Sequence, residues 1–84
     1  MTEDKRLKTI ELFAWIGEDE LGSGEIGIKQ GLVPAGYIPL VAIQRSKIQR
    51  GNIVQGLTKQ AQLYGKTIRL CRFVFSEVVQ ELEP

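Results

Sequence analysis

The strongest constraint on the fold lies in residues 9–16, T-I-E-L-F-A-W-I, where apolar residues alternate along the chain. Successive side chains of a strand point to opposite faces, so this spacing predicts a strand. Four aliphatic residues share one side of it: Ile10, Leu12, Ala14 and Ile16. Phe13 and Trp15 make the other side partly apolar, which is typical of a strand at the centre of a sheet or against a helix or a partner.

Two further strands are predicted on either side of a proline–glycine turn. Residues 25–33 alternate Ile26 and Ile28 with glycine or charged positions, and residues 37–43 form the return strand. The sequence P-A-G at residues 34–36 suits a three-residue hairpin loop, because proline presets φ and glycine accepts a left-handed conformation. Pro39 cannot donate to a strand ladder, so the return strand is expected at an edge of the sheet.

A helix is predicted from about residue 52 to residue 64. Four residues recur at helical spacing: Ile53, Leu57, Ala61 and Tyr64. Asn52 is a candidate N-cap, and Gly65 is a suitable end for the helix. A start at Ser46 would place Gly51 inside the helix, where glycine is unfavourable, so the shorter helix is preferred.

Residues 67–79 are rich in β-branched and aromatic side chains and predict a long final strand. The resulting order, β-β-β-α-β, predicts an α+β fold with a small, mainly antiparallel sheet and one helix packed on one face. The final strand either lies parallel to the third strand, through a right-handed crossover, or pairs with the first strand. The sequence leaves both arrangements open.

At 84 residues the chain is too short for two hydrophobic cores, and a single domain over residues 9–82 is expected. Residues 1–8 are mostly polar and predict a flexible lead, and residues 83–84 form a short tail. A single cysteine excludes an internal disulfide, which favours a reducing compartment. No segment resembles a signal peptide or reaches the ~20 apolar residues of a membrane span, so a cytoplasmic protein without membrane contact is expected.

Enzymatic chemistry finds little support in the sequence. The chain has no histidine, which removes the commonest general base and metal ligand. Cys71 has no histidine to activate it and is predicted to be a buried hydrophobe. Residues 22–27, G-S-G-E-I-G, match the dinucleotide-binding pattern GxGxxG, but no helix follows, and the acidic run at residues 18–20 lacks the spacing of a calcium loop. We therefore expect neither catalysis nor a cofactor or metal.

Two sets of residues are candidate binding surfaces. The aromatic set, a candidate docking surface for a protein partner or a second copy, comprises Phe13, Trp15 and Tyr37. The basic set, a candidate contact for nucleic acid, comprises Arg45, Lys47, Arg50 and Lys59. A net charge of +1 gives no general attraction to nucleic acid. The sequence therefore predicts a small non-enzymatic binding module for protein–protein interaction or homo-oligomerisation, with nucleic-acid binding as the alternative.

Overall fold

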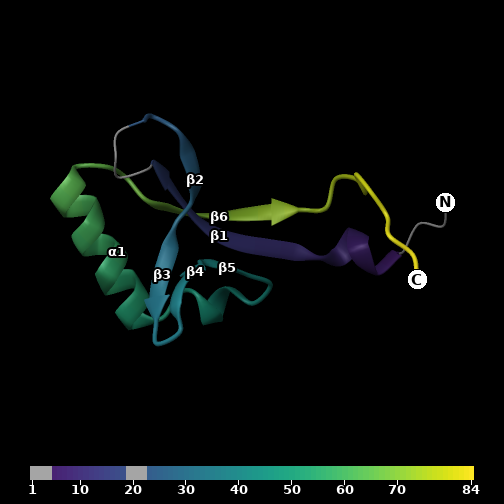
Figure 1. The fold of residues 1–84 in the computed structure, drawn as a ribbon, viewed down its shortest axis with the longest axis horizontal. Helices are drawn as coiled ribbons and strands as arrows, with labels where there is room; N and C mark the ends of the chain where they lie inside the picture. Colours follow the sequence, from purple (N-terminus) through teal and green to yellow (C-terminus); the bar gives the residue numbers. More distant parts are fainter. Residues whose placement is uncertain (1–4, 19–22) are drawn as a thin grey trace.

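The computed structural model describes residues 5–18 and 23–84 (Figure 1). Its elements in chain order are the 3-10 helix η1 (Lys5–Thr9), the strands β1 (Glu11–Glu18), β2 (Ile26–Ile28), β3 (Gln30–Val33), β4 (Gly36–Pro39) and β5 (Val41–Ala42), the 3-10 helix η2 (Arg45–Lys47), the helix α1 (Gly51–Tyr64) and the strand β6 (Arg69–Val74). Every strand pair between described residues is antiparallel. The predicted α+β fold is confirmed.

Strand β1 is the centre of the main sheet. One edge of β1 pairs with β6 from Glu11↔Val74 to Ile16↔Arg69. Its other edge pairs with β5 near Phe13 and with β2 from Ile16 onward. Of the two arrangements that the sequence leaves open, the structure has the one in which the final strand lies beside the first.

Strands β2 and β5 pair with the same edge of β1, and the β3–β4 hairpin lies between them in the sequence. The carbonyl of Trp15 accepts a hydrogen bond from the N–H of Lys29 (2.8 Å), and the N–H of Trp15 donates to the carbonyl of Leu40 (3.1 Å). The N–H of Leu40 donates to the carbonyl of Lys29 (2.9 Å) and closes the neck. The β3–β4 hairpin leaves the sheet here (Figure 1). The two strands predicted over residues 25–33 and 37–43 are therefore each divided at this neck.

The turn of the hairpin is tighter than the sequence predicts. Val33 pairs with Gly36, so the loop consists of Pro34 and Ala35 instead of three residues. Gly36 has φ 122°, a conformation that strains any residue with a side chain, which explains the glycine. Pro39 lies opposite Gln30 at the end of the two-stranded β3–β4 sheet, in an edge strand as expected.

Helix α1 begins one residue earlier than predicted and ends where predicted. Arg50 occupies the N-cap without a side-chain hydrogen bond, so Asn52 lies in the first turn and is not the cap. At the other end Gly65 has φ 66° and its N–H donates to the carbonyl of Ala61, which closes the helix in the left-handed conformation that glycine tolerates.

The side of α1 that faces the sheet follows the predicted spacing with one exception. Leu57 is buried, and Ile53 and Ala61 are half-buried, whereas Tyr64 is exposed. Tyr64 is the last residue of α1, where the helix has passed the end of the core. It was wrongly predicted to share the buried face.

The hydrophobic core is small. In the described part of the chain, the buried hydrophobic side chains are Ala14, Leu40, Ile48 and Leu57. Six partly buried residues pack against Leu40, Ile48 and Leu57: Phe13, Trp15, Ala42, Ile53, Ile68 and Leu70. Four of the six belong to strands of the main sheet. The indole N–H of Trp15 donates to the carbonyl of Ile48 at 2.7 Å. One helix therefore covers one face of the sheet, as predicted.

The two chain ends depart most from the sequence prediction. η1 adds a 3-10 helix over part of the predicted flexible lead and reaches Thr9, where the first strand was expected to begin; β1 begins at Glu11. β6 ends at Val74, and residues 75–84 contain no helix or strand, so the predicted final strand is too long. η1 and the segment after β6 lie at the same end of the molecule (Figure 1). Among the described residues, no helix is long and apolar enough to span a membrane.

Candidate interaction surfaces

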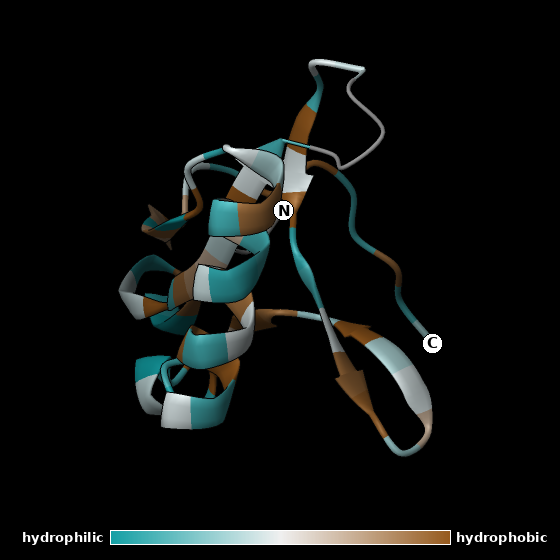
Figure 2. Ribbon diagram, turned by 90° about the vertical axis from the view of Figure 1, so that its left-hand side faces the viewer, coloured by the Kyte–Doolittle hydropathy of each residue, from teal (hydrophilic) through white to brown (hydrophobic). Residues whose placement is uncertain are grey.

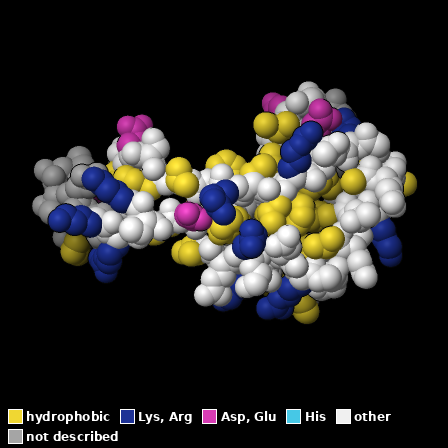
Figure 3. Space-filling model, turned by 180° about the vertical axis from the view of Figure 1, so that it is seen from behind, with side chains coloured by type: hydrophobic (Ala, Val, Ile, Leu, Met, Phe, Trp, Pro, Cys, Tyr) yellow, Lys and Arg dark blue, Asp and Glu magenta, His cyan; other side chains and the backbone are white. Residues whose placement is uncertain are grey.

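The chain exposes more surface than its mass accounts for. Its accessible surface is 7061 Å², whereas a compact monomer of 9.4 kDa exposes about 5,000 Å². Its radius of gyration is 15.4 Å, against about 12 Å for a compact domain of this length. Hydrophobic side chains gather across the middle of the side seen in Figure 3. The excess therefore includes apolar surface that a single chain does not bury.

Much of this apolar surface belongs to the face of the sheet opposite α1. Phe13, Trp15 and Leu70 pack toward α1, so the residues between them on β1 and β6 point the other way. Directly opposite strand residues share a face, which extends the assignment to β2 and β5. We call this surface the open face; its apolar residues are Leu12, Ala14, Ile16, Ile26, Ile28, Val41, Cys71 and Phe73.

The open face combines exposed side chains with a hollow. Ile26 is 74% exposed, Ile28 48%, Phe73 47% and Leu12 39%, while Ala14 is buried. A hollow of about 480 Å³ lies at the end of β1 where β2 and the α1–β6 connection meet. Open-face residues line part of it: Ile16, Glu18, Ile26, Arg69 and Cys71. Cys71 is partly exposed here, so its predicted burial in the core is wrong.

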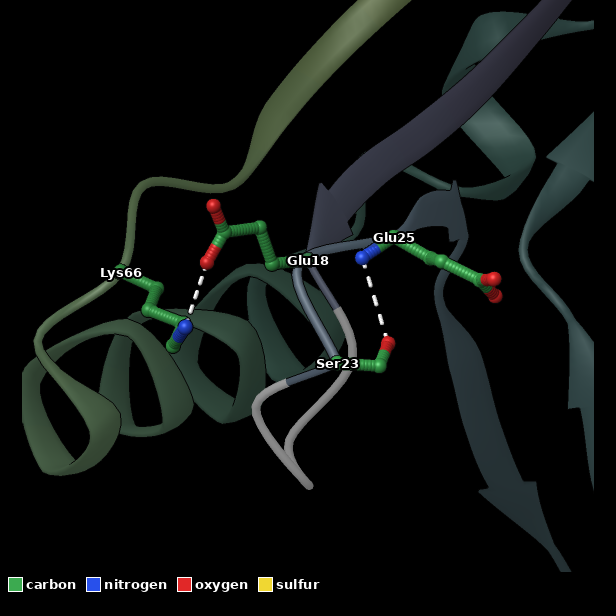
Figure 4. A network of polar contacts seen from close by, with 4 residues as sticks. All are labelled: Glu18, Ser23, Glu25 and Lys66. Atoms are coloured by element: carbon green, nitrogen blue, oxygen red, sulfur yellow. Dashed lines mark hydrogen bonds and ion pairs between the residues drawn. The ribbon is translucent and has the colours of Figure 1, made fainter.

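Ionic contacts border the open face at the hollow. Lys66, in the α1–β6 connection, forms an ion pair with Glu18 at the end of β1 (Figure 4). Nearby, the hydroxyl of Ser23 accepts a hydrogen bond from the N–H of Glu25 at 3.2 Å. Residues 19–22, which carry the rest of the acidic run and one glycine of the GxGxxG match, lie outside the described residues. Within residues 5–18 and 23–84, no group of acidic residues or cysteine could hold a metal ion.

A second surface is a groove of about 660 Å³ between the β3–β4 hairpin and α1. Figure 2 shows the hairpin, with hydrophobic segments in both of its strands, standing away from the helix. Tyr37 lines the groove from β4, and Lys47 and Arg50 line it from the segment that leads into α1. The side-chain oxygen of Gln60 is buried beside the groove without a hydrogen-bond partner.

A third feature is an aromatic ring between two guanidinium groups. Arg45 lies 5.8 Å and Arg72 5.6 Å from the centre of the Phe13 ring, within the range of cation–π attraction. The Nε of Arg72 also lies 3.3 Å from a carboxylate oxygen of Glu11. The charged groups are largely exposed, so the ion pair adds little stability. The two arginines are thereby held over the end of the sheet.

The predicted aromatic set is divided by the structure. Phe13 and Trp15 are half-buried and pack around the core, whereas Tyr37 is exposed on the hairpin. The predicted basic set is divided as well. Lys47 and Arg50 share the groove with Tyr37, Arg45 lies over Phe13, and Lys59 is exposed on α1 without lining the groove.

Sequence reasoning missed the open face as a surface. Leu12 and Ile16 were recognised as one face of the first strand, but that face was expected to meet a core. The signal available in the sequence was the alternation of Cys71 and Phe73 on one side of the final strand. The sequence did not determine that this strand lies beside β1. Only the pairing of β6 with β1 shows that these side chains join one uncovered surface.

These features define a small α+β domain with a small core and an uncovered apolar face on its main sheet. Comparison with protein-family models, curated proteins and solved structures finds no match to the chain.

Proposed function

We propose that this protein is a small non-enzymatic binding module that works by self-association. The observation that carries the proposal is the imbalance between its small core and its surface, which exceeds that of a compact monomer by about 2,000 Å². A typical specific interface removes about 800 Å² from each partner. The surplus belongs to the whole chain, including its extended C-terminal segment (Figure 1), and the part that supports association is the apolar open face.

The distribution of apolar residues supports association over catalysis. The exposed apolar side chains of the open face lie on strands, where backbone hydrogen bonds hold them in place, and a rigid apolar surface loses little entropy when it binds. The groove and the hollow contain no pair of residues that forms a nucleophile with its base. The chain has no histidine, the commonest general base, to take the proton of the Cys71 thiol.

Self-association is tested by measuring mass in solution. Light scattering and sedimentation over a range of protein concentrations should give a species of at least twice the 9.4 kDa of one chain. The apparent melting temperature should rise with protein concentration, because association stabilises the folded state by mass action. A folded species of 9.4 kDa at all concentrations up to the millimolar range would contradict the proposal.

Nucleic-acid binding is a second candidate, supported by the groove. An exposed aromatic ring and basic side chains in one groove are found where proteins stack and hold single-stranded nucleic acid, and Tyr37, Lys47 and Arg50 line one groove here. Against it, Arg45 and Lys59 of the predicted basic set do not line this groove. The proposal of self-association therefore takes precedence.

Fluorescence anisotropy with labelled single-stranded RNA and DNA tests this second candidate. Binding at low salt should weaken as salt rises, and the double variant Lys47→Glu, Arg50→Glu should abolish it. Lys59→Glu is the matched control, because it changes the same charge on an exposed residue outside the groove. Equal binding by the double variant and the wild type would exclude this groove as the nucleic-acid site.

A further inference from the structure

We propose that the open face is covered by the open face of a second copy, with Phe73 of each chain seated in the hollow of the other. This inference rests on the proposed self-association and names the surface that performs it. Both halves of the contact are present on one chain: an exposed aromatic side chain on β6, and a hollow lined by the apolar residues Ile16, Ile26 and Cys71 together with charged residues that include Arg69. A two-fold dimer uses the same patch on both copies, so knob and hollow must occur together on one face.

The positions along β6 fit this arrangement. Arg69 and Phe73 lie at opposite ends of the strand on the open face, with Cys71 between them. When two such faces pack with their strands antiparallel around an axis near Cys71, Phe73 of one copy meets the Arg69 end of the other. The hollow is at that end. The two Arg69 side chains stay apart, and each can stack on the Phe73 ring of the other copy.

The occupant follows from the charges at the hollow. Glu18 and Lys66 form an ion pair with each other, which leaves the guanidinium of Arg69, and an aromatic ring such as Phe73 of a second copy is a suitable neighbour for that cation. The rest of the face is apolar, as in the interfaces of homodimers. A second copy supplies both the aromatic ring and an apolar face without any further chain.

Pairing through the β6 edge is the competing way to form a dimer. Within residues 5–18 and 23–84, no backbone hydrogen bond outside its ladder with β1 involves a residue of β6, so its other edge is open. Edge pairing would leave the open face exposed to water on both copies. β6 also carries Arg69 and Arg72, and charged residues are a common protection of edge strands against pairing. These observations favour the face over the edge.

The test begins with two matched charge substitutions. Phe73→Glu places a carboxylate in the proposed contact, while Leu63→Glu makes the same kind of change at a residue of α1 that is 76% exposed and lies outside the open face. Phe73→Glu should weaken the dimer roughly 30-fold or more, as expected for loss of an anchor residue, and Leu63→Glu should leave it unchanged. Circular dichroism checks that both variants fold, and Ile28→Glu on β2 provides a second open-face variant.

The single cysteine supplies an independent reading of the geometry. In the face-to-face dimer Cys71 lies near the axis, so its reaction with a thiol reagent should slow as protein concentration rises, and Phe73→Glu should restore the fast rate. Sheets packed face to face lie about 10 Å apart, which is too far for the two Cys71 residues to form a disulfide. An edge-paired dimer centred on Cys71 sets the two sulfurs opposite each other and would be joined by a mild oxidant. The alternative register of an edge-paired dimer, centred on Arg72, would place two arginines directly opposite each other, which is unfavourable.

The outcomes separate the inference from the proposed function. A dimer that Phe73→Glu dissociates, with Cys71 protected and not cross-linked, supports the open-face assignment. A dimer that survives both Phe73→Glu and Ile28→Glu, or one in which Cys71 is readily cross-linked, overturns the assignment while self-association stands. A wild-type chain that remains monomeric, with Cys71 equally reactive at every concentration, overturns both.

Discussion

The indole N–H of Trp15 donates a hydrogen bond of 2.7 Å to the backbone carbonyl of Ile48. This contact joins the centre of β1 to the segment between η2 and α1 and spans 33 residues of sequence. The same residue uses its backbone to hold the neck of the β3–β4 hairpin, through Lys29 and Leu40. Trp15 therefore connects the sheet, the hairpin and the segment that leads into the helix.

Replacing Trp15 by phenylalanine keeps an aromatic ring but removes the donor. The carbonyl of Ile48 then loses its partner in a half-buried position, which costs about 1–3 kcal/mol. We expect a lower free energy of unfolding by about that amount, together with a loss from the smaller ring. Urea unfolding followed by circular dichroism measures it, since Trp15 is the only tryptophan and fluorescence is lost with it.

Tyr37→Phe is the matched control for this variant. It also removes one hydrogen-bonding group from an aromatic residue, but Tyr37 is exposed, so its stability should change by less than about 0.5 kcal/mol. All comparisons require one protein concentration, because self-association would contribute to the measured stability. Equal stability of Trp15→Phe and the wild type would show that the contact with Ile48 does not hold the helix to the sheet.

A second prediction concerns Gly31, where the hairpin leaves the sheet. A Cβ atom at this position would lie 2.8 Å from Cδ2 of Leu40, which is buried in the core cluster. Gly31→Ala should therefore displace Leu40 and destabilise the fold by about 1–3 kcal/mol. Thermal unfolding compared with Gly27→Ala checks this, because a Cβ at Gly27 meets nothing within 4 Å. Similar melting temperatures for the two variants would contradict close packing at the neck.

The sequence predicted most elements because they depend on local chemistry. The alternation in β1, the helical spacing of Ile53 and Leu57, and the glycine at the end of α1 act within a few residues of chain. The division of two predicted strands did not follow from such signals. It depends on the hydrogen bonds that the N–H of Lys29 donates to Trp15 and that the N–H of Trp15 donates to Leu40, and both partners are distant from Trp15 in sequence.

The candidate surfaces were harder to predict for the same reason. Exposed and buried aromatics look alike in sequence, so Phe13 and Trp15 were grouped with Tyr37 although only Tyr37 is exposed. The hollow beside Cys71 requires β2, β1 and the α1–β6 connection to meet, and the sequence left the place of the final strand open. A binding surface that is built from several strands can be predicted only once the order of the strands in the sheet is known.

A third prediction uses Gly56, in the middle of α1. Glycine in a helix costs about 0.5–1 kcal/mol relative to alanine, and a Cβ here meets nothing within 4 Å. Gly56→Ala should therefore raise the free energy of unfolding by about that amount, which denaturant unfolding measures. Gly56 also lines the groove of Tyr37, Lys47 and Arg50, so the variant adds a methyl group there. A stability gain without any change in oligomeric state is the expected result, and a loss would mean that the groove closes in solution.

The fourth prediction concerns the same substitution, glycine to alanine, at the end of the same helix, where it should have the opposite effect on stability. Gly65 also has open space around its Cβ position, so crowding cannot affect the outcome. Its φ of 66° is left-handed, however, and alanine pays about 1 kcal/mol to adopt it. Gly65→Ala should therefore destabilise the fold by about 1 kcal/mol in the unfolding assay in which Gly56→Ala stabilises it. Because the two variants add the same methyl group, their opposite signs would isolate backbone conformation as the cause. If both substitutions stabilise the fold, the left-handed end of α1, and with it the path of the chain into β6, must be different in solution.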